Sequence, residues 1–203
     1  MVRIHVCMLA IAILCTATSS VSQSNVRVAI GDETVERFYL SVGGYFNIPA
    51  QDVQLARGGG LKPEETSVAL FIASKGHVAP AVVIDLRIAG RSWIEIGARY
   101  GIGPETYYVP LQRLVSGPPY GKAYGFYKKR PKKHWKSITL SDADIVELVN
   151  LRFLSDQNGY TADDVVKLRV QGMSFVAIHE KARVKVRSAP GHGGKKLKSP
   201  QKD

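Results

Sequence analysis

The sequence predicts an all-α protein made of tandem helix-turn-helix-like hairpins, with a long Pro/Gly/Tyr-rich connection between them. The main observation is a duplicated segment, since Val82–Ile102 aligns without a gap with Asp164–Val184. Both copies carry Leu-Arg, then Gly-x-Ser, an aromatic residue and an isoleucine at the same places. A helix that ends at a glycine, followed by a serine that caps the next helix, accounts for this pattern.

Residues 1–22 are expected to be a signal peptide that is removed on export. Arg3 is followed by an apolar run, Val6–Cys15, and then by small residues, which is the order typical of a secretory leader. The apolar run is too short to span a bilayer, and cleavage after Ser22 is favoured. The alternative is an ordinary buried N-terminal helix. The leader predicts a periplasmic or secreted protein.

Both cysteines, Cys7 and Cys15, fall inside this leader. The exported chain is therefore expected to contain no disulfide, no thiolate nucleophile and no cysteine metal site. About 180 residues remain, enough for one sizeable core or two small ones. No later segment is long and apolar enough to cross a membrane.

The N-terminal helical units are expected over residues 23–102. Asn25–Ile30 alternates apolar and polar residues, which is typical of a short strand or an extended arm. A helical pattern begins at Glu33 and is expected to end at Gly43 and Gly44. A short helix should follow from near Pro49 to the triple glycine after Arg57.

A third, weaker copy of the repeat is suggested by Phe38–Pro49, which parallels Ala69–Pro80 at an offset of 31. Between them, Pro63–Ser74 reads as a helix that opens with Pro-Glu-Glu, whose carboxylates favour a helix N-terminus. In the second unit, Ser92 is expected to cap a helix with Glu95 in a capping box.

The connection, residues 103–140, is too rich in proline and glycine to sustain long helices. Its aromatic residues are too frequent for a disordered spacer, so an ordered loop that buries some of the rings is expected. The C-terminal unit, 141–187, should begin with a helix capped by Ser141, turn at Asn158-Gly159, restart at Thr161 and end near Lys181. The basic tail, 188–203, is expected to be disordered.

The segment Leu86–Tyr108, LRIAGRSWIEIGARYGIGPETYY, resembles the helix-turn-helix of site-specific recombinases and related DNA-binding regulators. The resemblance implies that Pro104–Tyr108 opens the helix that reads the major groove. Pro110 would then fall inside that helix, where it removes a backbone donor, and the second copy has no such helix. The matching scaffold positions are Gly90, Ser92, Ile96, Gly101 and Ile102.

The whole chain, including GPPYGKAYGFYKK before the last unit, also looks like a family of uncharacterised exported proteins of Gram-negative bacteria. That resemblance implies no activity.

Positive charge is concentrated in two segments of the chain, whose formal net charge is +11. Pro110–Ser141 holds eight Lys or Arg and no acid, and the tail from Lys181 adds eight more against one acid. Interleaved cations and rings can contact phosphate groups while stacking on bases or sugars. The alternative is that the rings pack on the helices while the lysines solvate the loop or neutralise acidic helical faces. The candidate binding residues are Tyr120, Tyr124, Tyr127, Lys128, Lys129, Arg130, Lys132, Lys133 and Trp135.

Nothing in the sequence favours catalysis, a metal or a cofactor. The histidines lack metal-ligand spacing, and Gly58–Gly60 lacks the Lys-Ser/Thr ending of a phosphate loop. The paired acids Glu64-Glu65 and Asp163-Asp164 stand at expected helix starts. We therefore expect an exported, non-enzymatic interaction protein that binds an anionic lipid, a polysaccharide or a nucleic acid, or a protein partner in the envelope. The alternatives are a protein–protein scaffold and nucleic-acid binding through the partial helix-turn-helix.

Overall fold

A computed structural model of the chain describes residues 22–113, 117–157 and 159–188. All regular secondary structure in these residues is helical, which confirms the predicted all-α class. The predicted leader and the predicted basic tail lie outside the described residues, apart from Ser22 and Ser188 at their edges. The helices, in chain order, are α1 (Ser22–Phe46), α2 (Ala50–Gly58), α3 (Pro63–Gly76), α4 (Pro80–Ile88), α5 (Trp93–Arg99), η1 (Pro104–Tyr107), α6 (Gly121–Lys129), η2 (Lys132–Ser137), α7 (Asp142–Gln157), α8 (Ala162–Val170) and α9 (Phe175–Ser188).

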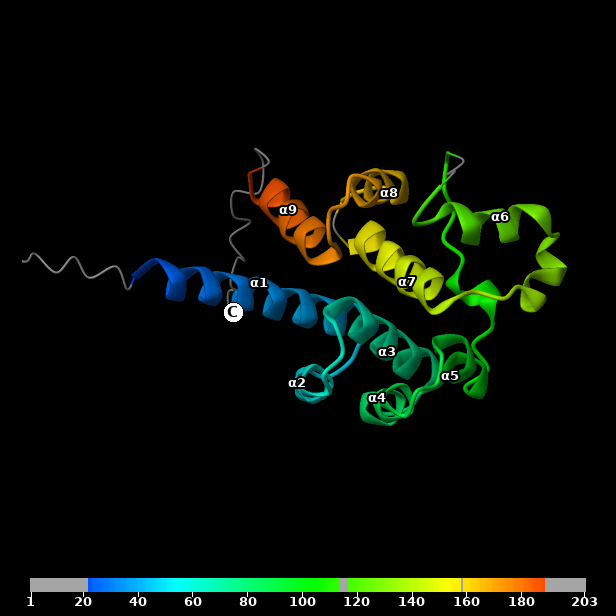
Figure 1. The fold of residues 1–203 in the computed structure, drawn as a ribbon, viewed down its shortest axis with the longest axis horizontal. Coiled ribbons are helices and arrows are strands. Elements are labelled where there is room, and N and C mark those ends of the chain that lie inside the picture. Colours follow the sequence, from blue (N-terminus) through cyan, green and yellow to red (C-terminus); the bar gives the residue numbers. More distant parts are fainter. Residues whose placement is uncertain (1–21, 114–116, 158, 189–203) are drawn as a thin grey trace, which may run out of the picture.

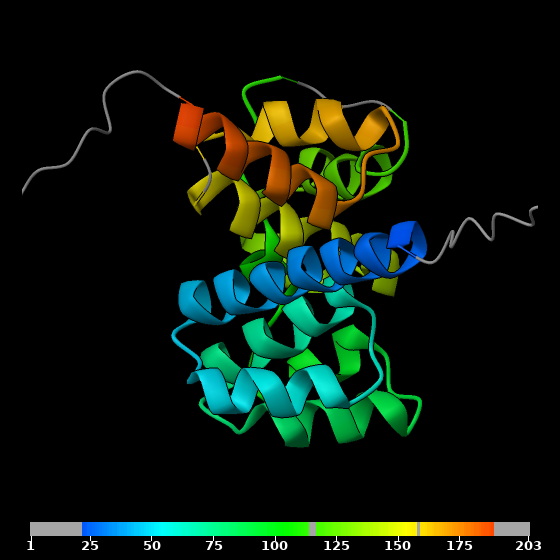
Figure 2. The same cartoon turned by 90° about the vertical axis from the view of Figure 1, so that its left-hand side faces the viewer.

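Helices α1 and α3 run through the middle of the molecule (Figure 1). The short helices α2, α4 and α5 lie on one side of this pair, and α7, α8 and α9 lie on the other (Figure 2). Every residue from Thr66 to Ala73 in α3 is buried. A helix that is apolar on all sides needs neighbours on all sides, so α3 is the centre of the core.

One hairpin recurs three times, as α2–α3, α4–α5 and α8–α9. In each, a nine-residue helix is followed by a glycine with positive φ, and the next helix begins three residues after that glycine. The three glycines are Gly60 (φ 75°), Gly90 (φ 84°) and Gly172 (φ 84°). This left-handed conformation is easily reached only by glycine, which explains why the glycine recurs in the sequence.

The weaker copy is therefore present in the fold, but at an offset of 30 and not 31. Asn47 (φ 57°) and His77 (φ 53°) both take the left-handed conformation at the end of their helices. The residues after them donate matching hydrogen bonds, Ile48 N to Gly43 O and Val78 N to Ala73 O. The alignment on Pro49 and Pro80 was wrong by one residue because proline marks the start of a helix only to within a position or so.

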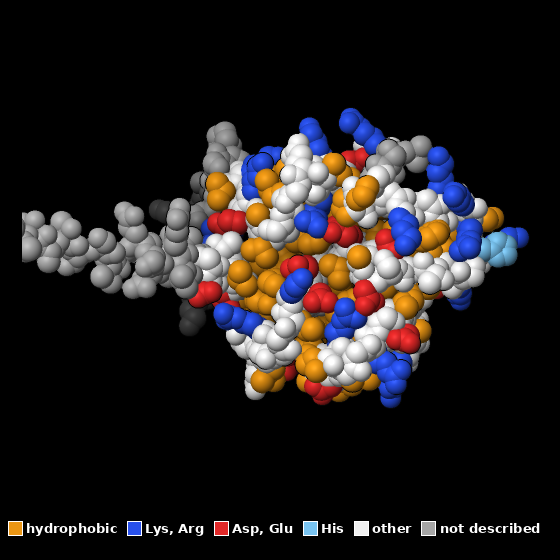
Figure 3. Space-filling view, viewed as in Figure 1, with side chains coloured by type: hydrophobic (Ala, Val, Ile, Leu, Met, Phe, Trp, Pro, Cys, Tyr) orange, Lys and Arg blue, Asp and Glu red, His pale blue; other side chains and the backbone are white. Residues whose placement is uncertain are grey.

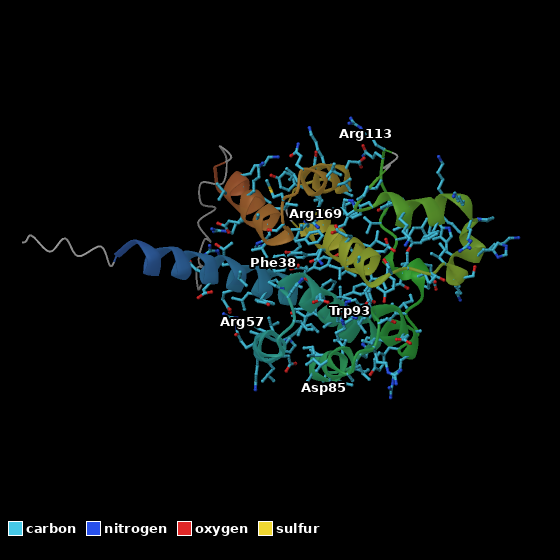
Figure 4. The ribbon with its side chains drawn as sticks, viewed as in Figure 1. Phe38, Arg57, Asp85, Trp93, Arg113 and Arg169 are labelled. Atoms are coloured by element: carbon cyan, nitrogen blue, oxygen red, sulfur yellow. The ribbon has the colours of Figure 1, made fainter. Side chains whose placement is uncertain are left out.

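An arginine occupies the same place, the eighth residue of the first helix, in all three hairpins: Arg57, Arg87 and Arg169. Each forms an ion pair with a carboxylate on a longer helix, and Figure 4 labels the first and the last of them. Arg57 pairs with Glu36 of α1. Arg169 pairs with Glu147 of α7, with 3.1 Å between Nε and Oε2.

Arg87 joins three helices. Its guanidinium lies 3.0 Å from Glu65 on α3 and 2.5 Å from Asp142 at the start of α7, and it lies over the ring of Trp93, 4.7 Å from the centroid. Burial alone would lower the pKa of Arg87, but the hydrogen bonds that it donates to Asp142 and Glu65 outweigh burial, so the pKa is raised. The arginine that recurs in each hairpin therefore links that hairpin to a neighbouring helix.

Helix starts agree with the sequence prediction where the signal is local. Ser92 and Glu95 form the predicted capping box at α5, and Thr161 and Asp164 form another at α8. Hydrogen bonds from Ser92 lower the pKa of Glu95, and those from Thr161 lower the pKa of Asp164. Ser141 caps α7 as expected, since Asp144 N donates to its hydroxyl at 3.2 Å.

Two predicted boundaries in α1 are wrong. Asn25–Ile30 is helical, and α1 continues past Gly43 and Gly44 to Phe46. A Cβ built on Gly43 would lie 2.3 Å from Cγ2 of Val53 on α2. Gly43 therefore lets α2 approach α1 closely. It is a packing glycine and not the predicted end of the helix.

Helix α9 is also longer than predicted, reaching Ser188 and not ending near Lys181. In the first copy of the repeat, α5 ends at Arg99 and the chain turns at Gly101, which has φ 73°. The aligned residue of the second copy is Arg183, which has no such freedom of φ. The helix therefore continues where the first copy turns.

Candidate functional site

Residues 117–140, which we call the arm, project from one end of the helical body (Figure 1). The arm contains α6 and η2, so the connection holds one nine-residue helix inside the predicted loop. Tyr107, Tyr120 and Tyr127 are buried. The expectation that an ordered connection buries some of its rings is confirmed.

Hydroxyl and indole groups fasten the arm to the chain around it. Tyr127 donates to the carbonyl of Pro104, and Tyr124 donates to the carbonyl of Val109, each at 2.6 Å. Within the arm, Trp135 Nε1 donates to the carbonyl of Arg130 at 3.0 Å and so links η2 to the end of α6. Burial, followed by the neighbouring tyrosines, raises the pKa of both Tyr124 and Tyr127, so these hydroxyls stay protonated and remain donors.

The ring of Tyr108 lies at the centre of this cluster. Its centroid is 4.5 Å from that of Trp135, 5.0 Å from that of Tyr127 and 6.0 Å from that of Tyr124. Arg152 of α7 donates to the carbonyls of Thr106 and Tyr108, both at 2.8 Å. The arm is thereby joined through Tyr108 to the core helix α7.

The cations of the arm are exposed to solvent, and one of them, Arg130, also donates from Nη1 to the carbonyl of Ser137 at 3.2 Å. Lys and Arg side chains gather over the α6 end of the molecule in Figure 3, while acidic side chains lie nearer the middle. Within the part of the chain that the structure describes, none of these cations forms an ion pair with a carboxylate. The exposed cations of the arm are Lys122, Lys128, Lys129, Arg130, Lys132, Lys133 and Lys136.

The predicted site residues thus fall into two groups. The five predicted cations, Lys128–Arg130 and Lys132-Lys133, are all exposed. Among the predicted rings, Tyr120 and Tyr127 are buried and support the arm from within, whereas Tyr124 and Trp135 are half-buried. Only the latter two predicted rings can offer surface to a ligand.

A pocket of about 270 Å³ opens between the arm and the non-helical segment Tyr108–Arg113 that follows η1. Three predicted rings, Tyr124, Tyr127 and Trp135, line it together with Lys128, so the structure brings part of the predicted site together. The residues that sequence reasoning did not assign to the site come from upstream of the arm. The full lining is Tyr108, Leu111, Gln112, Arg113, Tyr124, Tyr127, Lys128 and Trp135.

The paired acids have structural roles. Asp163 accepts hydrogen bonds from the backbone N of Gln112 and of Arg113, both at 2.9 Å, and Glu65 pairs with Arg87. Across the described ranges, no three His, Cys, Asp or Glu side chains lie close enough together to hold a metal ion. Among the helices that the structure describes, none combines the length and the apolar character that crossing a membrane requires.

The segment that would open a DNA-reading helix has a different structure. Pro104–Tyr107 forms only the short 3-10 helix η1, and the chain from Tyr108 to Arg113 is not helical. Pro104 and Tyr107 are buried.

Comparison with models of known protein families, with curated proteins and with solved structures finds no match for this chain.

Proposed function

We propose that this chain is a non-enzymatic interaction protein whose arm binds an anionic partner. The observation that carries the proposal is the group of seven exposed cations of the arm, none paired with a carboxylate in the described residues. Cations that stabilise a fold are usually paired, as Arg87 and Arg169 are here. The charges of the arm remain available to a partner.

The anchoring of the arm supports the same reading. Buried rings and three hydrogen bonds from Tyr124, Tyr127 and Trp135 hold the backbone that carries the cations. A charged surface that is already ordered loses less conformational entropy on binding than a disordered tail. The arm is therefore a prepared surface and not a flexible solubilising segment.

Mutual repulsion among the cations favours a partner that carries several negative charges. Such a partner neutralises many cations at once and releases its own condensed counterions, so affinity depends steeply on salt. If residues 1–22 are removed on export, the partner would be an anionic lipid, a polysaccharide or a nucleic acid in the envelope or outside the cell.

The proposal is tested by the affinity of the purified chain for fluorescently labelled heparin at low salt. The arm variant replaces Lys128, Lys129, Arg130, Lys132 and Lys133 with Gln. A matched control variant removes five exposed cations elsewhere, namely Lys62, Lys75, Arg91, Arg99 and Lys167.

We expect the arm variant to bind heparin about a hundredfold more weakly than the unmodified chain. The control variant, which has the same net charge, should lose only a small part of its affinity. Equal losses in the two variants would show that net charge, and not the arm, attracts the polyanion, and the proposal would then be wrong.

A further inference from the structure

The pocket beside the arm offers ring surface that the packing of the arm does not use. Tyr108, Tyr124 and Trp135 are each half-buried and turn part of their surface to the pocket, and Tyr127 lies beneath them. These rings meet at centroid distances of 4.5 to 6.4 Å with tilted or edge-on geometry. An added flat ring would extend an existing aromatic cluster.

The polar atoms of three of these rings are committed within the protein. The hydroxyls of Tyr124 and Tyr127 donate to backbone carbonyls, and the indole N–H of Trp135 lies within hydrogen-bond distance of two more. Gln112, Arg113 and Lys128 also line the pocket and carry side-chain hydrogen-bond donors. A ligand recognised through the face of a ring needs none of them.

Charge decides what kind of ring fits. An aromatic cluster by itself also suits a quaternary ammonium group. Here Lys128 lines the pocket, and Lys132 Nζ lies 5.8 Å from the centroid of Trp135. No Asp or Glu lines the pocket in the described residues, so a cation would be repelled and an anion attracted.

We propose that this pocket takes one unstacked base of a single-stranded nucleic acid, whose flanking phosphates pair with the cations of the arm. This inference rests on the proposed function and names a ligand class for it. The pocket volume of about 270 Å³ is enough for one base. Stacking on aromatic residues beside a cationic track is how proteins hold single strands without reading their sequence.

The test compares two polyanions on the full chain: a labelled single-stranded oligodeoxynucleotide of mixed sequence, and heparin, which carries charge but no bases. Tyr124→Leu removes a ring from the pocket, and Tyr124→Phe keeps the ring while removing its hydroxyl. Both variants lose the hydrogen bond from Tyr124 to the carbonyl of Val109, so the difference between them reports on the ring alone. We expect Tyr124→Leu to bind the oligonucleotide about tenfold more weakly than Tyr124→Phe does, and the two variants to bind heparin equally.

A second readout does not depend on any variant. Trp93 is fully buried whereas Trp135 lines the pocket, so quenching of tryptophan fluorescence reports on Trp135. The oligonucleotide should quench it and heparin should not, and the single strand should bind more tightly than its duplex.

Equal effects of Tyr124→Leu on both polyanions, or no quenching by the oligonucleotide, would overturn the base pocket. Heparin binding that requires the arm cations would still support the proposed function in that case. If the unmodified chain binds neither heparin nor the oligonucleotide, both proposals are wrong.

Discussion

The helical body and the arm use charged and aromatic residues in opposite ways. In the body, the repeated arginines Arg87 and Arg169 pair with carboxylates on neighbouring helices and lie over aromatic rings. In the arm, the exposed cations have no carboxylate partner among the described residues, and the rings provide the attachment. Charge therefore stabilises the fold in one region and remains available in the other.

This contrast separates two kinds of substitution. Removing a body charge should cost stability because it leaves a partly buried partner unpaired. Removing an arm charge should cost affinity for polyanions and leave the fold unchanged. The following predictions test each half of the contrast, from the largest expected effect to the smallest.

The largest effect is expected for Arg169→Met. Glu147, its partner, is only 12% exposed, and an uncompensated buried carboxylate costs about 3 kcal/mol or more of unfolding free energy. Arg57→Met, at the same place in another copy of the hairpin, breaks a pair in which the arginine is 42% exposed and should cost about 1 kcal/mol or less. Urea denaturation of both variants measures the difference, and equal losses would mean that burial does not set the strength of these pairs.

Smaller losses are expected from ring hydroxyls. Tyr127→Phe removes the hydrogen bond to the carbonyl of Pro104 at 2.6 Å and should cost about 1 kcal/mol. Tyr107→Phe removes a buried hydroxyl that has no hydrogen-bond partner in the described residues, so stability should be unchanged or slightly higher. Thermal unfolding followed by circular dichroism distinguishes the two variants, and a larger loss for Tyr107→Phe would refute this assignment of the arm's attachment.

His179 makes the body sensitive to pH. Burial lowers its pKa below the ordinary value of 6.5, with opposing influence from Glu180 and reinforcing influence from Arg183 and Arg37. The unfolded chain therefore binds a proton near pH 6.5 before the folded chain does, so stability is complete above that pH and falls as the pH drops.

We expect a loss of up to about 1 kcal/mol between pH 7 and pH 5.5, measured by urea denaturation at each pH. His179→Phe, which keeps a ring against Phe38 and Phe153, should be insensitive to pH over this range. If the unfolding free energy of the variant falls with pH as it does in the unmodified chain, groups other than His179 cause the fall.

The smallest effect on stability is expected for the arm variant described above. Its five exposed cations make no ion pairs in the described chain. Exposed substitutions of this kind change the unfolding free energy by within about 0.5 kcal/mol in either direction, so the five together are expected to have a net effect near zero. A melting temperature close to that of the unmodified chain would sharpen the contrast between body and arm. A large fall in melting temperature would show that the arm charges also support the fold.

Local signals in the sequence predicted local structure well. The capping boxes at Ser92 and Thr161 depend on residues three positions apart, so a short pattern contains all the information they require. The glycine of each repeated turn is predictable for the same reason. The all-α class follows from these signals together.

Long-range contacts could not be predicted from the same patterns. Gly43 is a packing glycine because Val53 of α2 contacts it, and no local pattern distinguishes this from a helix stop. The burial of Tyr120 and Tyr127, and the contribution of Tyr108 and Leu111 to the pocket, depend on how the connection folds back onto the body. The aromatic residues of the connection were a correct signal of order, but they did not reveal which rings face outward.

The most direct test of the contrast is the dependence of heparin affinity on salt concentration in the unmodified chain, the arm variant and the control variant. Each cation that contacts the polyanion contributes about one unit to the slope of log affinity against log salt. We expect the unmodified chain and the control variant to share a steep slope, and the arm variant to have a slope shallower by several units. The same slope in all three proteins would contradict the claim that the arm is where this molecule holds its anionic partner.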